Sequence, residues 1–172
     1  MNQTQLDART RTFAWPDPAV YAAHVGRTTG TEFMRMMIAG ELPPPPIMHT
    51  LGVDSIEGAD GRVTVTMSAR EYHYNPLGVV HGGVLATLLD TAAGCAVHTT
   101  LPAGVGYTSL DLTTKFLRPV TVESGRLTCV GTVLSRGRRT ALAEARLTDE
   151  RDRLVAHATS SCLIFPLPEA SP

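Results

Sequence analysis

Apolar and polar residues alternate along six segments of the chain. A period of two is typical of strands that bury one face. It predicts strands at residues 53–57, 62–67, 107–117, 125–136, 140–148 and 154–165. Between the second and third segments, the residues from Val84 to Val97 are almost all Leu, Ala, Val, Thr, Gly and Cys. A helix that is apolar all round is a buried helix, so this stretch predicts a long central helix.

The order of these segments predicts the fold class. Two strands precede the helix and four follow it, with short turns at positions such as Gly61, Pro119 and Gly137. Strands on both sides of one buried helix can form an antiparallel sheet that wraps around it. We therefore expect an α+β fold built on a single long helix.

The first 46 residues follow another pattern. Asp17-Pro18 is typical of an N-cap followed by proline in the first helical position. Thr29 to Glu32 has the spacing of a capping box, and Gly40 is placed to end the helix that follows. We expect a helical extension over residues 1–46, with a stiff, proline-rich connector at 41–46.

The length of the chain limits the number of domains. With 172 residues, of which 43% are hydrophobic, it can fill one core but not two ordinary ones. We expect a short turn over residues 47–52, one domain over 47–166 and a tail over 167–172.

Charge and cysteine content narrow the possible partners. A formal net charge of −1 does not favour nucleic acid or an acidic membrane as a partner. Cys95, Cys129 and Cys162 lie in apolar segments without Cys-x-x-Cys spacing, which favours buried thiols in a reducing compartment. The histidines other than His81 lack metal-ligand spacing, so we expect no metal. No apolar run is long enough for a signal sequence or membrane span, so we expect a cytoplasmic protein.

A single carboxylate interrupts the central helix. Asp90 lies eight residues after Gly82, within a run that offers no polar face to carry it to water. A buried carboxylate is a better base or nucleophile than one on the surface, and such groups are concentrated at functional sites. The structural alternative is a hydrogen bond to neighbouring backbone or to Thr91. We interpret Asp90 as catalytic.

Two glycines mark the start of the same helix. The first N–H groups of a helix have no partner within it and lie at the positive end of the helix dipole. Without a Cβ at Gly82, a carbonyl oxygen can approach that N–H, which would stabilise negative charge on the oxygen during attack. Gly82-Gly83 also fits an ordinary tight turn.

Three motifs in succession resemble those of one family. The pattern Asn-x-x-Gly-x-x-His-Gly-Gly, followed by six apolar or small residues and Asp, runs from Asn75 to Asp90. The segments from Tyr107 to Pro119 and from Ser135 to Thr140 follow it. Together they resemble the hotdog-fold acyl-CoA thioesterases of the phenylacetate-degradation (PaaI) type, over about residues 47–165. The resemblance implies a hotdog fold, in which an antiparallel sheet wraps around one long helix.

The resemblance also implies roles for residues near the helix start. Asn75 would hydrogen-bond the active-site water or carboxylate, His81 would orient the thioester carbonyl or the neighbouring loop, and Ser109 would position the attacking water. Read without the resemblance, Asn75 also fits a turn before Pro76, and His81 fits a turn residue. A nucleophilic serine is not expected, because the chain has no Gly-x-Ser-x-Gly motif.

A local excess of arginine on a near-neutral protein predicts a phosphate site. Arginine side chains suit phosphate oxygens, and coenzyme A carries a pyrophosphate and a 3′-phosphate. Arg118 follows the third predicted strand, and Arg136, Arg138 and Arg139 surround one tight turn. The alternative is that this turn is only a solvated hairpin tip, but the resemblance implies that coenzyme A is held at this strand end and hairpin. The residues expected to contact substrate or coenzyme A are Gly83, Arg118, Pro119, Val120, Arg136, Gly137, Arg138, Arg139 and Thr140.

These expectations combine into hydrolysis of an acyl-CoA thioester, without a cofactor. The Gly82 N–H would bind the thioester oxygen, and Asp90 would either attack the carbonyl or activate water. The resemblance suggests an aryl or arylacetyl group. A hydratase or dehydratase of the same fold fits less well, because His73 occupies the position of Asp in its Asp-x-Asn-Pro-x-His signature. A non-catalytic acyl-CoA sensor would be expected to lack Asp90.

The spacing within the helix predicts an assembly. At 1.5 Å per residue, Gly82 and Asp90 lie roughly 12 Å apart, too far to touch one thioester group. Two helices packed antiparallel across a two-fold axis would bring Gly82 of one subunit near Asp90 of the other. We expect a homodimer with shared sites, Asn75, His81 and Gly82 facing the partner's Asp90 and Ser109. The resemblance further implies a tetramer of two such dimers.

Overall fold

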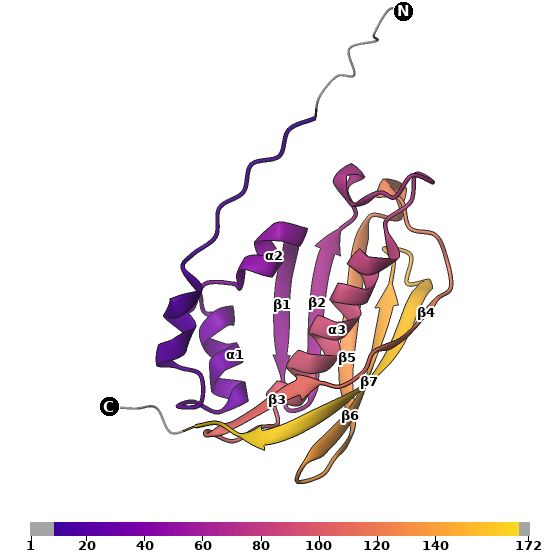
Figure 1. Ribbon diagram of the computed structural model, residues 1–172. Coiled ribbons are helices and arrows are strands. Elements are labelled where there is room, and N and C mark those ends of the chain that lie inside the picture. The colour runs from indigo at the N-terminus through magenta and orange to yellow at the C-terminus, as the bar shows by residue number, and fades with distance from the viewer. Residues whose placement is uncertain (1–8, 169–172) are drawn as a thin grey trace, which may run out of the picture.

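The computed structural model describes residues 9–168 and contains one antiparallel sheet of seven strands (Figure 1). The strand order is β1-β2-β5-β6-β7-β3, and β4 also pairs with β7. The strands are β1 (Val53–Ala59), β2 (Arg62–Ser68), β3 (Val105–Ser109), β4 (Thr113–Phe116), β5 (Arg126–Arg136), β6 (Thr140–Thr148) and β7 (Leu154–Pro166). The helix α3 (Gly82–His98) packs against the sheet. This is the hotdog fold expected from the sequence.

The core lies between α3 and the inner face of the sheet. Leu88, Leu89 and Ala92 of the helix are buried there, together with the alternating inward residues Val63 and Val65 of β2. Glycine at position 131 permits this close packing, because a Cβ there would lie 2.1 Å from a carbonyl oxygen of the helix. The helix is not buried all round, however. Asp90 is only half-buried, so the expected full burial of this segment is wrong for the single chain.

The predicted strand over residues 107–117 is two strands in the structure. The chain leaves regular pairing at residues 110–112, between β3 and β4. There, the carbonyl and carboxylate oxygens of Asp111 accept hydrogen bonds from Ser160 Oγ (2.8 Å) and Ser161 N (3.1 Å). Hydrogen bonds between side chains and backbone here take the place of regular backbone pairing between strands. An alternating sequence pattern alone does not reveal them.

The N-terminal segments form three short helices: a 3₁₀ helix, η1 (Pro18–Ala23), then α1 (Gly30–Ile38) and α2 (Pro46–Leu51). Asp17 and Thr29 cap the first two, accepting from Ala19 N and Glu32 N. Only this half of the predicted capping box is formed, because the Glu32 carboxylate accepts from Arg35 instead. The turn expected over residues 47–52 is instead the helix α2. Pro46 occupies its first turn, where a fixed φ and a missing N–H favour helix formation.

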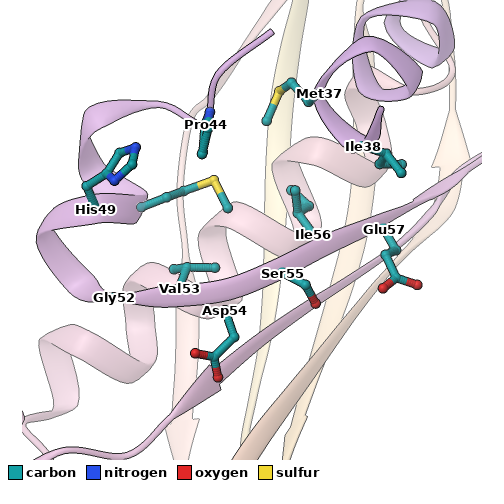
Figure 2. Close-up of a pocket in the computed structure, with 11 residues that line it drawn as sticks. Met37, Ile38, Pro44, His49, Gly52, Val53, Asp54, Ser55, Ile56 and Glu57 are labelled. Atoms are coloured by element: carbon teal, nitrogen blue, oxygen red, sulfur yellow. The ribbon is translucent and has the colours of Figure 1, made fainter. Parts of the chain in front are cut away.

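The N-terminal helices pack beside the strand β1 at one edge of the sheet (Figure 1). A cleft of about 410 Å³ separates them from that strand. Figure 2 shows Met37 and Ile38 of α1 and Pro44 of the connector on one side of it, with Val53 and Ile56 of β1 on the other. None of the residues predicted for the active site lines this cleft.

Candidate active site

The side chains of Asp90 and Ser109 meet on the open side of α3. Ser109 Oγ donates a hydrogen bond of 2.9 Å to Asp90 Oδ1. Asp90 is half-buried, while Ser109, the last residue of β3, is exposed. The structural alternative for Asp90, a bond to Thr91 or nearby backbone, is therefore not what the structure shows. The pair joins an acidic group with a hydroxyl that can also accept a hydrogen bond from water.

A shallow cleft of about 350 Å³ surrounds this pair. Ala86 and Thr87 line it from the helix, and Leu110 and Leu112 line it from the segment after β3. Asp111, which was not predicted as a site residue, is a second carboxylate in the same cleft. Its Oδ1 accepts from the backbone N–H of Ser161, whereas Asp90 Oδ1 accepts from the side-chain hydroxyl of Ser109.

The thiols of Cys95 and Cys162 lie near Asp90 and are alternative candidates for the nucleophile. Their raised pKa values argue against this role. Burial, with a smaller contribution from the Asp90 carboxylate, raises the pKa of Cys95 to about 12. Burial also raises the pKa of Cys162 above its ordinary value. Only the thiolate of cysteine is an effective nucleophile, so both groups remain packing residues at neutral pH, as the sequence analysis expected.

His81 is the N-cap of α3. Its ring Nδ1 accepts a hydrogen bond of 2.9 Å from Gly83 N, and its backbone N–H donates to His73 O at 2.8 Å. Since Nδ1 accepts, the ring proton of the neutral imidazole is on Nε2, where it can be donated to a substrate. The Gly83 N–H, by contrast, is already used. Gly83 therefore does not offer a free N–H for a direct hydrogen bond to substrate.

The Gly82 N–H is differently placed. No acceptor for it is found within the part of the chain that the structure describes. The ring of Phe116 lies 3.1 Å from the position that a Cβ would take, so a larger residue here would have to displace the ring slightly. Gly82 and Phe116 line a mainly apolar cleft of about 370 Å³ that includes Val79, Leu117 and Pro119. A free N–H at the positive end of a helix is suited to a carbonyl oxygen.

The Asn75 side chain organises the loop that leads to the helix. Its Oδ1 accepts from Leu77 N at 2.9 Å and Val79 N at 3.4 Å. The predicted turn-forming role is thus present in the structure. Only the amide NH₂ of Asn75 remains for the role that the family resemblance implies.

The helix separates the predicted catalytic groups into two sets. Asn75, His81 and Gly82 lie at its N-terminal end, whereas Asp90 and Ser109 meet two turns further along. At 1.5 Å per residue, Gly82 and Asp90 are roughly 12 Å apart. One chain therefore holds both halves of the expected site, but not within reach of the same thioester group.

The predicted arginines are also separated within one chain. Arg118 N bonds to Val155 O at the start of β7, whereas Thr140 of the hairpin pairs with Leu163 near its other end. Eight residues of strand correspond to roughly 26 Å. Figure 1 shows the hairpin between β5 and β6 at the opposite end of the sheet from the start of α3. The expectation of a single arginine cluster is wrong for one subunit.

Two further observations on the described residues concern membrane spans and metal ligands. No helix among them is long and apolar enough to cross a membrane. Within residues 9–168, no three His, Cys, Asp or Glu side chains are grouped so that they could hold a metal ion. The chemistry available at this site is that of a carboxylate, hydroxyls, an imidazole and backbone N–H groups.

Comparison with known proteins agrees with this fold and these groups. The sequence profile of the thioesterase superfamily matches residues 77–156. A Halobacterium salinarum protein named as an esterase is 32% identical over 118 residues, which cover 66% of this chain and 76% of that protein. Human acyl-coenzyme A thioesterase 13 is 27% identical over 124 residues, covering 72% and 87% of the two chains.

A solved structure is also similar. It is that of a phenylacetic acid degradation-related protein from Ralstonia eutropha, described as a thioesterase, with a TM-score of 0.69 and 31% identity. The match covers 76% of this chain and 98% of that one. The fold, the helix carboxylate and these similarities define a thioester hydrolase. The chain belongs to the thioesterase superfamily and has the hotdog fold.

Proposed function

We propose that this thioester hydrolase acts on acyl-coenzyme A, releasing a carboxylate and free coenzyme A. The observation that carries the proposal is the hydrogen bond from Ser109 to Asp90, on a helix whose first N–H, at Gly82, has no acceptor among the described residues. The name of the human relative, an acyl-coenzyme A thioesterase, supports the substrate class.

The two halves of the site have distinct tasks in the reaction. The Gly82 N–H, the helix dipole and the His81 Nε2–H stabilise negative charge on the thioester oxygen. Asp90 either takes a proton from the attacking water or attacks the carbonyl carbon itself, forming an anhydride that water then cleaves. Ser109 holds the water in the first case and orients the carboxylate in both. In each case the C–S bond breaks, and the thiolate of coenzyme A leaves and takes up a proton.

The distance between the two halves supports a site shared by two subunits. Among the described residues, β3 and β4 form an edge of the sheet without a further strand beside them. Beside this edge, Leu110, Phe116 and Leu117 are 60%, 53% and 53% exposed. Apolar residues along an open edge favour association with another chain. We propose that a second subunit packs here and brings its Asp90 and Ser109 to Gly82, and that two such dimers form a tetramer.

The acyl group is proposed to be aryl or arylacetyl. The support is the similarity to the Ralstonia eutropha protein, whose description links it to phenylacetic acid degradation. Such a group would lie beside α3, where clefts are lined by Gly82 and by Asp90.

The decisive experiment is a panel of acyl-CoA esters assayed for release of free thiol. The panel should contain benzoyl, phenylacetyl, short aliphatic and medium aliphatic esters at matched concentrations. We expect hydrolysis, with the highest kcat/KM on the aromatic esters. Activity confined to aliphatic esters would refute the acyl preference. Binding of all esters without thiol release would refute the hydrolysis and indicate a sensor.

A further inference from the structure

Three arginines from separate parts of the sequence line one cleft. Arg118 follows β4, and Arg151 and Arg153 belong to the turn between β6 and β7. The cleft has a volume of about 350 Å³ and also includes Thr121 and Ser124. The turn arginines are far from Arg118 in sequence and were not among the residues predicted for the site.

A buried carboxylate holds this turn in place. The Asp149 side chain is 1% exposed, and its Oδ2 accepts from Arg153 Nε at 2.8 Å and lies 2.7 Å from Arg153 Nη2. Its other oxygen accepts from the backbone N–H groups of Arg151 and Arg153. These bonds fix the guanidinium of Arg153 before any ligand arrives. A pre-organised arginine loses less side-chain freedom on binding an anion than a free one.

This cleft adjoins the one at the start of α3. Arg118 and Pro119 line both of them. The first cleft presents the three arginines, and its neighbour presents the apolar side chains of Leu117 and Val120 and the backbone of Gly82. Across the two clefts the environment changes from cationic to apolar and then to a hydrogen-bond donor for an oxyanion. This order matches the order of groups in an acyl-CoA, which is pyrophosphate, pantetheine arm and thioester.

We propose that Arg118, Arg151 and Arg153 bind the pyrophosphate of coenzyme A. The assignment rests on the proposed function, because it places the nucleotide by reference to the thioester position at Gly82. Arginine forms charge-assisted, often bidentate hydrogen bonds to phosphate oxygens. The arginines predicted at the hairpin, Arg138 and Arg139, cannot supply this contact from the same chain, since they lie at the far end of the sheet.

One acidic residue in the cleft allows a substitution that should strengthen binding, the opposite of the effect expected for the arginines. Glu123 lines the same space and accepts a short hydrogen bond from Thr121 Oγ1. Its negative charge opposes a bound pyrophosphate. Removing that charge should therefore strengthen binding, an effect that loss of structure cannot imitate.

The experiment compares substrates that differ in their phosphates. Arg151→Gln and Arg118→Gln should each raise KM for an acyl-CoA ester by about tenfold, with kcat nearly kept, as expected for a lost charge-assisted hydrogen bond. The same rise should occur with the dephospho-CoA ester, which retains the pyrophosphate but lacks the 3′-phosphate. The N-acetylcysteamine thioester of the same acid, which has no phosphate, should show no change in kcat/KM. Glu123→Gln should lower KM for both nucleotide esters.

Arg27→Gln is the matched control, because Arg27 is exposed and belongs to the N-terminal extension. It should leave KM unchanged. A normal KM in Arg151→Gln and Arg118→Gln would overturn the proposal, as would a rise seen with acyl-CoA but lost with dephospho-CoA. An equal loss on the N-acetylcysteamine thioester would mean that the arginines support the fold. If the wild type hydrolyses none of these thioesters, the proposed function fails instead, and the two failures are thereby distinguished.

Discussion

Ser109 at the end of β3 donates a 2.9 Å hydrogen bond to Asp90 in the middle of α3, 19 residues earlier in the chain. The bond joins a helix to the edge strand of the sheet and turns one carboxylate oxygen toward that strand. Because Asp90 is only half-buried and Ser109 is exposed, the pair is open to a ligand or to a second subunit.

Asp90→Asn keeps the shape of the side chain but removes both the base and the nucleophile. Turnover should fall by at least about a hundredfold, with coenzyme A binding nearly intact. Steady-state kinetics together with calorimetric titration of free coenzyme A would check this. Near-normal turnover in this variant would exclude Asp90 from the chemistry.

Ser109→Ala removes the hydroxyl that contacts Asp90. A hydrogen bond to a charged group contributes about 1.5–3 kcal/mol, so kcat should fall by roughly ten- to a hundredfold if the bond persists in the reacting complex. Thr108→Ala, at the neighbouring exposed position of β3, is the control and should keep kcat. Equal kcat values for the two variants would contradict a role for Ser109.

Arg138→Glu combined with Arg139→Glu tests the hairpin. These side chains can reach a coenzyme A bound at Gly82 only from another subunit, and we expect them to contact its 3′-phosphate. KM should rise for acyl-CoA esters and stay unchanged for small non-nucleotide thioesters. The effect should be lost with dephospho-CoA esters, the reverse of the result expected for Arg151. An equal loss on small thioesters would assign the hairpin to folding.

Asp149→Asn tests the turn that carries Arg151 and Arg153. The hydrogen bond from Arg153 holds the pKa of Asp149 below its ordinary value. A lowered pKa in the folded state means that the carboxylate stabilises the fold above the unfolded pKa of about 3.9 and loses this effect as the pH falls through the folded value. Denaturant unfolding should show the variant less stable by roughly 1–3 kcal/mol at pH 7. The difference should shrink steadily below about pH 4, and a difference that is independent of pH would contradict this account.

Mixed dimers test the shared site. Asp90→Asn chains and His81→Ala chains, each expected to be nearly inactive alone, should be refolded together in equal amounts. About half of the dimers are then mixed, and one of their two sites has both groups intact, so activity should recover to about a quarter of the wild-type value. Mixed dimers that form but remain inactive would place the whole site within one chain.

Much of this fold could be predicted from local patterns. Side chains alternate across a strand, so the segments around Val63 and Val65 reveal their buried face in the sequence. The caps at Asp17 and Thr29 were predictable for a similar reason, since each bonds within three residues of itself. The carboxylate at Asp90 and the glycine at Gly82 were recognisable because both interrupt or begin an otherwise apolar helix.

Contacts between distant residues were decided only by the tertiary structure. The sequence pattern predicted one strand over residues 107–117, but bonds from Ser160 and Ser161 divide it. It grouped Arg118 with the hairpin arginines, whereas the antiparallel sheet places them at opposite ends of β7 and brings Arg151 and Arg153 beside Arg118 instead. Periodicity records which face of an element is buried, but not which other element lies against it. That depends on the strand order and register of the folded sheet.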